Sequence, residues 1–196
     1  MIIEDTVLEA PRAYAPCEFR IKWADSAWEV AQARALRRSV FCTEQGVFVG
    51  DDGDAIDEDL RNPAQTLVAV STLGGLPDQV VGTVRIHRAD AALHSDGDPE
   101  GVWWGSRLAV HAAFRHHGRI GSTLITLAVR SAHARGCHAF LAHVQAPNVP
   151  LFQKLRWQWL RDEQLHGRAH ALMQADLSAY PPCHDPITGL VTRSGA

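Results

Sequence analysis

A basic loop between an apolar strand and a helix is the part of the sequence best suited to chemistry. Residues 111–122 read HAAFRHHGRIGS and follow the apolar run LAV. Backbone N–H groups at the start of a helix bind anions, and arginine adds charge-assisted hydrogen bonds to phosphate. We expect a phosphate-binding loop here; a helix start with solvated arginines is the alternative. The candidate anion ligands are Arg115, His116, His117, Gly118, Arg119, Gly121 and Ser122.

The charge distribution favours a bound anion. The chain has 19 Lys and Arg against 22 Asp and Glu, a net charge of −3. Residues 101–161 contain no Asp or Glu but 8 Lys and Arg, whereas residues 1–100 contain 18 acidic residues. A carboxylate-free segment attracts an anionic ligand, but the overall acidity repels a polyanion. We therefore expect a nucleotide cofactor rather than a nucleic acid.

Hydrophobic periodicity predicts the elements that must position this loop. A central strand over 103–110 leads into the loop, and a helix over 121–135, ended by Gly136, follows it. The other expected elements are strands over 19–23, 66–71, 80–86 and 139–144, a helix opened by a capping box at Ser26 and ended by Gly46, a short helix over 148–155 and a hairpin over 158–177 that turns at His166-Gly167. This order predicts an α/β fold with a mixed sheet of about seven strands and helices on both faces.

One domain is enough to account for the chain. A length of 196 residues with 46% hydrophobic and 21% charged residues is typical of a single globular domain. We expect an N-terminal arm over 1–17, the domain over 18–177 and a C-terminal tail over 178–196. No apolar stretch is long enough to cross a membrane, the start lacks a secretory signal, and the 4 cysteines form no CxxC pair. The sequence thus predicts a reduced, cytoplasmic protein without membrane contact.

The segment over 104–157 resembles the cofactor core of the GNAT family of N-acetyltransferases. The hallmark of that family, Arg/Gln-x-x-Gly-x-Gly/Ala, cradles the pyrophosphate of acetyl-CoA between a strand and a helix. Two registers fit this chain: one starts at Arg115 with Gly118 fourth, and the other starts at His116 with Arg119 fourth and Gly121 sixth. The resemblance implies the α/β GNAT fold with acetyl-CoA as cosubstrate. It also implies that the strands over 103–110 and 138–145 part to hold the pantetheine arm.

Further runs extend the resemblance over residues 18–183. The run NVPLFQKLRW resembles a stretch after the fifth strand of the family and adds Asn148 and Phe152 to the cofactor residues. The family pattern also implies that backbone at Leu108 and Val110 pairs with the pantetheine arm, and that an N–H near Val110 polarises the thioester carbonyl. The runs WWGSRLAV, HGRIG, AHVQ and MQADL most resemble the nitrogen-starvation-type N-acetyltransferases of nitrilase gene clusters.

The usual catalytic groups of this family are missing. Phe152 stands where a tyrosine acts as general acid, and the strand over 103–110 has no carboxylate to act as general base. The only tyrosines, Tyr14 and Tyr180, are expected outside the core. A positioned acid or base contributes about 10²–10⁴-fold, whereas juxtaposing two reactants contributes about 7–11 kcal/mol. An acetyltransferase therefore remains the leading hypothesis.

Other residues are then candidates for proton transfer. Seven acidic residues lie between Glu44 and Asp59, and we expect Glu44 and Asp57 to face the cleft. His143, near the end of the fifth strand, is a third candidate, with a core histidine as the alternative. An acidic rim would attract a cationic amine, so we expect a small amine or amino-acid-like acceptor; an anionic acceptor held by arginines stays open.

Two other functions remain open. The run RRSVFCTEQ at 37–45, followed by Asp57, resembles the opening of acyl-homoserine-lactone synthases, although those enzymes lack the tight pyrophosphate loop. The missing acid and base are also compatible with a non-catalytic acyl-CoA-binding sensor. His116 and His117 lack the spacing of metal ligands, so no metal is expected. A homodimer is compatible with the sequence.

Overall fold

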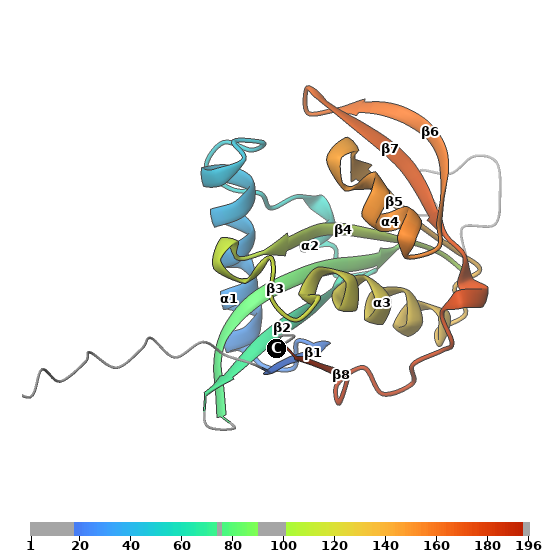
Figure 1. Cartoon of the computed structure of the whole chain (residues 1–196). Helices are drawn as coiled ribbons and strands as arrows, with labels where there is room; N and C mark the ends of the chain where they lie inside the picture. The colour runs from blue at the N-terminus through green and yellow to red at the C-terminus, as the bar shows by residue number, and fades with distance from the viewer. Residues whose placement is uncertain (1–17, 74–75, 90–100, 194–196) are drawn as a thin grey trace, which may run out of the picture.

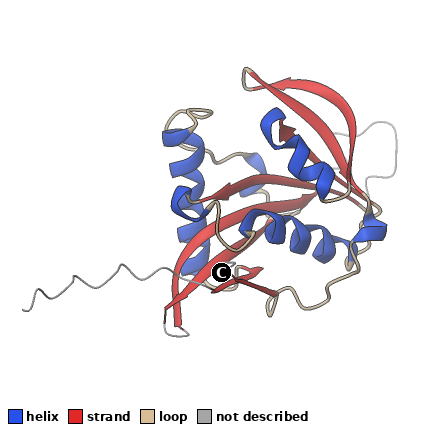
Figure 2. Ribbon diagram, in the orientation of Figure 1, coloured by secondary structure: helices blue, strands red, loops and turns tan. Residues whose placement is uncertain are grey.

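A mixed sheet forms the centre of the molecule (Figure 1). The computed structural model describes residues 18–73, 76–89 and 101–193. The strands are β1 Glu18–Trp23, β2 Gln65–Leu73, β3 Leu76–Arg88, β4 Val102–Val110, β5 Ala139–Gln145, β6 Trp157–Leu165, β7 Arg168–Ala175 and β8 Leu190–Arg193. The helices are α1 Ala27–Arg38, α2 Ala55–Glu58, α3 Ile120–His133 and α4 Val149–Lys154. The predicted α/β fold, with helices against a sheet, is confirmed (Figure 2). The sheet has eight strands in the order β6-β7-β5-β4-β3-β2-β1-β8.

Alternating side chains of β2 divide the hydrophobic core into two layers. Leu67 and Ala69 belong to the layer beneath α3, where Leu124 is fully buried. Val68 and Val70 belong to the layer beneath α1. Successive side chains of a strand point to opposite faces, so this one strand anchors both helices. The expectation of helices on both faces is confirmed.

The first helix begins as predicted but ends differently. Ser26 caps α1 by accepting a hydrogen bond from the backbone N–H of Glu29 at 3.2 Å. The Glu29 carboxylate does not close the capping box; it accepts from the N–H of Asp25 and pairs with Lys22 at 2.8 Å. After α1 the chain continues as a π-helical segment, η1 Ser39–Glu44, and Gly46 ends it with a φ of 61°. A φ in this range suits glycine, which explains Gly46 as the terminator.

The C-terminal segment departs from the sequence-based expectation. Tyr180 was expected outside the core, but this expectation was wrong: Tyr180 is 4% exposed and belongs to the main core. Its hydroxyl accepts from Trp157 Nε1 at 3.1 Å and donates to the Leu155 carbonyl. Strand β8, within the expected tail, pairs antiparallel with β1 and accounts for the eighth strand. The predicted arm over 1–17, with Tyr14, lies outside the described residues.

Candidate functional site

The central strands β4 and β5 part halfway along their length. These parallel strands pair only as far as Gly105 opposite Ala142 within the described chain. The register between β4 and β3 shifts between Thr83 and Arg85, and Arg107 has a φ of 54°. Such a bulge bends a strand, so β4 turns away from β5 while staying paired with β3. The predicted parting of these two strands is confirmed, and among the described residues the β5-facing backbone groups of β4 have no strand partner beyond Gly105.

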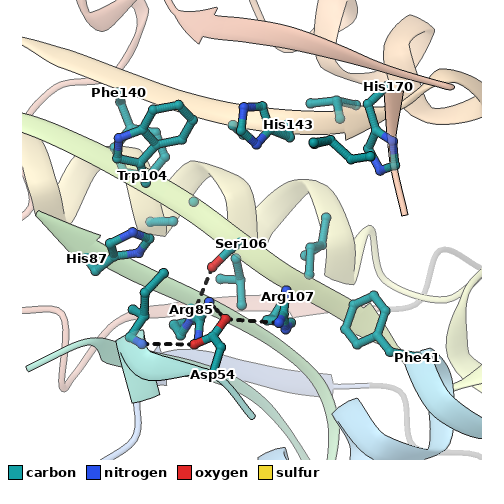
Figure 3. A pocket seen from close by; sticks show the side chains of 18 of the residues that line it. Phe41, Asp54, Arg85, His87, Trp104, Ser106, Arg107, Phe140, His143 and His170 are labelled. Carbon is teal, nitrogen blue, oxygen red and sulfur yellow. Dashed lines mark hydrogen bonds and ion pairs between the residues drawn. The ribbon is translucent and has the colours of Figure 1, made fainter. Parts of the chain in front are cut away.

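A cavity of about 1160 Å³ occupies the gap and reaches both faces of the sheet (Figure 3). We call its side beneath α3 and α4 the apolar half, and the opposite side the histidine half. The apolar half is lined by Leu108, Ile125, Ala128 and Phe152. The histidine half is lined by His87, Trp104, His143 and His170. A cavity with an apolar wall and a few convergent polar groups is the usual form of a ligand site.

The start of α3 is built to receive an anion. Arg119, the residue before the helix, has φ 51° and ψ 34°, and no side chain caps the helix. The hydroxyls of Ser122 and Thr123 donate back to the Arg119 carbonyl, at 2.9 and 3.0 Å. The N–H groups of a first helical turn have no partner within the helix. A Cβ at Gly121 would meet only Val110 Cγ2, at 3.8 Å, so a ligand has room beside these N–H groups.

The residues around the start of α3 are anchored by packing against the hydrophobic core. Ile120 is 2% exposed, and a Cβ at Gly82 would come within 2.8 Å of its Cγ2 atom. A Cβ at Gly118 would meet Phe19 at 2.8 Å, and the Gly118 carbonyl accepts from the Thr192 hydroxyl. His116 is exposed, whereas His117 Nδ1 is buried and has no hydrogen-bond partner among the described residues. Strand β8 therefore supports the loop through Thr192.

The structure brings Arg115 and Glu44 together. Arg115 Nη2 lies 2.5 Å from Glu44 Oε2, and Arg115 Nε donates to the Val110 carbonyl at 3.1 Å. The hydrogen bond from Arg115 holds the pKa of the Glu44 carboxyl below its usual value. Arg115, a predicted anion ligand, and Glu44, a predicted base, thus form an ion pair with each other, and neither lines the cavity.

Asp57 belongs to a buried network of charges. The members of this network, three arginines and three aspartates, are Arg37, Arg85, Arg107, Asp52, Asp54 and Asp57. Asp57 Oδ2 lies 2.7 Å from Arg37 Nη2 and 2.9 Å from Arg85 Nη1. Burial raises the pKa of Asp57, but the hydrogen bonds and charges of Arg37 and Arg85 have the larger combined effect and hold this pKa far below its usual value. Asp57 does not line the cavity, and such a weak base is poorly suited to accept a proton.

His143 does reach the cavity. It projects from β5 beyond the parting point, and its ring lies 5.0 Å from the Trp104 ring, centroid to centroid. His143 Nε2 lies 3.0 Å from Glu163 Oε2 on β6. Burial is the main reason that the pKa of His143 lies below its usual value, so the ring is neutral at neutral pH. Figure 3 shows the rings of His143, His87 and Trp104 around the same space.

Two segments far apart in sequence form an arch beside the cavity. Gln145 Nε2 donates to Gln45 Oε1 at 3.1 Å, and Arg168 Nη2 donates to the Gln45 carbonyl. The Phe48 ring lies 4.9 Å from the ring of His166, at the turn of the β6–β7 hairpin. We call this set of contacts the arch; it joins the segment after α1 to the C-terminal hairpin.

The remaining predicted cofactor residues lie at the apolar half. Asn148, next to α4, and Phe152, within α4, both line the cavity, and Phe152 is 7% exposed. The Phe152 ring packs edge-on against Trp157 at 4.9 Å. Tyr180 binds the other side of Trp157 and does not line the cavity, so no tyrosine among the described residues replaces the missing acid there.

Sequence reasoning missed several residues of the site. The roles of Asp52 and Arg107 were not expected, because no local spacing pairs them across 55 residues. Glu163 and His170 lie on the hairpin that was predicted, but their approach to His143 depends on strand register. Nothing in the sequence indicated the bulge at Arg107, because arginine rarely adopts a positive φ.

Comparisons with known proteins agree with this geometry. The Acetyltransferase (GNAT) family matches residues 34–156. Among solved structures, Escherichia coli ElaA aligns with a TM-score of 0.62 at 18% identity, covering 82% of this chain and 99% of that chain. An acyl-CoA N-acyltransferase from Pseudomonas aeruginosa aligns with a TM-score of 0.60 at 21% identity, covering 80% and 97%. FeeM, an N-acyl amino acid synthase from uncultured soil microbes, aligns with a TM-score of 0.64 at 12% identity, covering 85% and 95%.

The chain belongs to the GNAT acetyltransferase family, because the family match spans more than half of its length. It is therefore an acyl-CoA-dependent N-acyltransferase of the GNAT type that acts on a small acceptor. No curated protein sequence matches the chain. None of the described helices is long and apolar enough to span a membrane, and the described residues contain no cluster of three metal-ligating side chains.

Proposed function

We propose that the protein transfers an acetyl group from acetyl-CoA to the amino group of a small, amino-acid-like acceptor, by direct attack within a ternary complex. The observation that carries this proposal is the cavity through the parted strands β4 and β5, because it joins two binding regions in one space. Holding two reactants in attack geometry can supply about 7–11 kcal/mol of the barrier. Such a site needs little further help, since a thiolate with a pKa of about 8.5 is a good leaving group.

We propose that the pyrophosphate of acetyl-CoA binds at the start of α3, in the register from His116 to Gly121. Ile120 is buried in the core and cannot occupy the position that faces phosphate, whereas Gly121 has open space beside it. Arg119 would then stand fourth in the motif, in the left-handed conformation that glycine usually supplies. Ser122 completes the first turn, and Arg115, His117 and Gly118 shape the loop behind it.

The pantetheine arm would lie in the apolar half of the cavity. Backbone groups at Leu108 and Val110 are free of β5 at this point, so they can pair with the amides of the arm. Asn148 and Phe152 would line the other side. A backbone N–H near Val110 would polarise the thioester carbonyl, and a fixed dipole of this kind stabilises the developing oxyanion.

The acceptor would occupy the histidine half. Glu58 and Asp59 line the cavity on that side and would attract an ammonium group, whereas Asp54, which also lines it, is paired with Arg85 and Arg107. Glu44 and Asp57 are engaged with arginines, so we propose a structural role for them instead of the proton transfer expected from the sequence. His143 is the remaining candidate for proton acceptance.

The narrower expectations from the sequence stay proposals. We propose membership of the nitrogen-starvation-type N-acetyltransferases of nitrilase clusters, a domain over 18–177, a cytoplasmic location and a homodimer. The N-terminal arm, the dimer and the location can be tested by limited proteolysis, light scattering and fractionation.

A second candidate is an acyltransferase like the acyl-homoserine-lactone synthases. It is favoured by the contacts that join Arg37 to Asp57 and by Phe41, which lines the cavity. Together with Glu44, these three residues are those that resemble the opening of such synthases.

Release of CoA thiol separates these functions. The wild-type protein is incubated with acetyl-CoA or octanoyl-CoA and a panel of amino acids, aliphatic amines and aromatic amines. Turnover with acetyl-CoA and an amino acid is expected, and mass spectrometry should find the N-acetyl product. Preference for octanoyl-CoA would favour the second candidate. Calorimetric binding of acetyl-CoA without turnover on any amine would overturn both and indicate a sensor.

A further inference from the structure

A carboxylate that sequence reasoning did not identify holds the cavity histidine. Glu163 Oε2 lies 3.0 Å from His143 Nε2, and the Glu163 side chain is only 18% exposed. The pairing of β5 and β6 with β7 sets this contact: His143 lies opposite Leu172, and Glu163 lies opposite His170. Three paired strands thus fix the spacing of the two groups.

We propose that Glu163 is the positioning residue of a His143–Glu163 pair, in which His143 accepts the proton of the attacking amine. This inference rests on the proposed N-acetyltransferase function. It names the group that replaces the missing carboxylate of β4, and it places that group on β5 with its support on β6.

The contact with Glu163 favours one tautomer of the ring. A carboxylate 3.0 Å from Nε2 is an ion-pair contact that favours a proton on that nitrogen, which leaves the lone pair on Nδ1. Nδ1 has no hydrogen-bond partner among the described residues, and the ring lines the cavity. The Trp104 ring packs beside the imidazole with an interplanar angle of 51°, which limits its rotation. The acceptor nitrogen is therefore presented to the cavity.

The proposed step balances in protons and electrons. The amine nitrogen forms a bond to the thioester carbonyl carbon, and the carbon–sulfur bond breaks with its electron pair leaving on sulfur. The amine proton passes to His143 Nδ1, which becomes an imidazolium beside the Glu163 carboxylate. The CoA thiolate leaves as the anion or takes that proton on departure. No oxidant, metal or further reactant is needed.

The charges around His143 are consistent with this role. Burial lowers the pKa of the ring and Glu163 raises it, while His170 and Arg161 lower it further. Arg161 binds the other oxygen of Glu163, at 2.7 Å, from the same strand. His170 is held by its own contact, since Nδ1 lies 2.9 Å from the Arg168 carbonyl. The ring is thus neutral and ready to accept a proton at neutral pH.

The test uses pH profiles of kcat/KM for the best amine found. In the wild type, activity should fall on the acid side as His143 is protonated. His143→Asn should lower kcat/KM by about 10²-fold or more and abolish this acid limb. Glu163→Gln keeps the size of the side chain but removes its charge, so the limb should move to lower pH by about one unit. Its plateau should also fall, because the ring is then a weaker base.

Asp162→Asn is the matched control. Asp162 is the neighbour of Glu163 on β6, and it accepts from Trp159 Nε1 at 3.0 Å on the exposed side. It loses the same charge and should keep the wild-type profile. Titration of the His143 ring by NMR gives a second readout: its pKa should fall in Glu163→Gln and stay unchanged in Asp162→Asn.

The outcomes separate this inference from the proposed function. Wild-type turnover with unchanged pH profiles in His143→Asn and Glu163→Gln would overturn the pair and leave the acetyltransferase standing. Absence of wild-type turnover on every amine would overturn the proposed function itself. An acid limb that moves equally in Asp162→Asn would show a general charge effect and would also overturn the positioning role.

Discussion

Arg119 combines a strained backbone with a favourable place for charge. Its φ of 51° lies in a region that non-glycine residues rarely adopt, and it directly precedes the first turn of α3. Strain of this kind costs on the order of 1–3 kcal/mol and is concentrated at functional sites. The Arg119 side chain is exposed and belongs to the residue that precedes the first turn, so its charge can add to the attraction that the free N–H groups of the helix exert on an anion.

Arg119→Glu should weaken acetyl-CoA binding by about 1–3 kcal/mol, because a charge-assisted hydrogen bond is replaced by repulsion. Isothermal titration calorimetry measures the change. Arg34→Glu, an exposed reversal of charge on α1, is the control and should bind like the wild type. Equal affinity of Arg119→Glu and the wild type would remove the pyrophosphate from the start of α3.

His87 is an uncharged histidine in the wall of the cavity. Its Nδ1 atom is buried without a hydrogen-bond partner among the described residues, and burial is the main cause that lowers its pKa to about 4. The folded state therefore binds a proton at His87 less readily than the unfolded chain does. Its contribution to stability is complete above the unfolded pKa of about 6.5 and is lost as the pH falls from there through about 4.

His87→Gln should flatten the pH dependence of stability between about pH 6.5 and 4. Urea unfolding at several pH values measures this dependence. His143 also has a lowered pKa and acts in the same window, but it is present in both proteins, so the difference between them reports His87. Asp54 and Asp57 have lowered pKa values too, but their effect falls below about pH 4. An identical slope in wild type and variant would contradict the buried neutral state of His87.

At the scale of elements, α3 owes its position to a glycine on β3. A Cβ at Gly82 would lie 2.8 Å from Ile120 Cγ2, 3.0 Å from Leu124 Cδ1 and 3.1 Å from Ala69 Cβ. No side chain larger than hydrogen fits between this strand and the helix. The close approach sets where the first turn of α3, with its free N–H groups, lies relative to β4.

Gly82→Ala should therefore affect both stability and cofactor binding. Overpacking of this kind costs about 1–3 kcal/mol of unfolding free energy. Because the crowding falls on the first turn of α3, the affinity for acetyl-CoA should fall as well. Gly136→Ala is the comparison: its φ of 81° makes alanine costly, but nothing lies within 4 Å and the site is distant in sequence from the loop. It should lower stability and leave the affinity unchanged.

Sequence periodicity predicted the elements that have strong local signals. The helix over 121–135, the strand over 103–110 and the turn at His166-Gly167 all appear within a few residues of their predicted bounds. Strand β8 was missed because four residues, LVTR, carry too little pattern and depend on pairing with β1. Tyr180 was misplaced for a related reason, since its burial depends on Trp157 rather than on its neighbours in sequence.

The sequence predicted those site residues that lie within or next to elements with a local sequence signal. The predicted loop, Asn148 and Phe152 are contiguous with elements that could be identified; Asn148 and Phe152 line the cavity, whereas residues 115–122 are not among its lining residues. The proton transfer that we propose depends on a pair of residues on different strands, which no sequence spacing reveals. Glu44 and Asp57 were chosen for their charge, but the arginines that bind them lie 71 and 20 residues away.

At the scale of the whole molecule, the buried charge network connects four segments. Arg85 on β3 is 2% exposed and makes two hydrogen bonds to Asp54, at 2.6 and 2.8 Å, and one to Ser106, at 3.0 Å. Arg37 adds α1, and Arg107 adds β4. These contacts fix the segment around α2 against the sheet, beside the histidine half of the cavity.

Arg85→Met should lower the unfolding free energy by about 3–5 kcal/mol, because Asp54 and Asp57, both partly buried, each lose one of their two arginine partners. Urea unfolding with a spectroscopic probe measures the loss. Arg38→Met removes an exposed ion pair with Asp51 and should cause no measurable change. Equal stability of the two variants would show that the network contributes no more than a surface pair.

The arch has a consequence for the order in which parts of the protein fold and acceptor binding is acquired. Its contact between Gln45 and Arg168 spans 123 residues, and the contact between Gln45 and Gln145 spans 100. Contacts that close such long loops carry a large entropic cost and depend on the strands between them being formed first. During refolding, helices and hairpins should therefore recover before the two flanks of the cavity are joined. Acquisition of acceptor binding then marks the last stage of folding, and an incompletely folded chain has a sheet but not yet a finished enzyme.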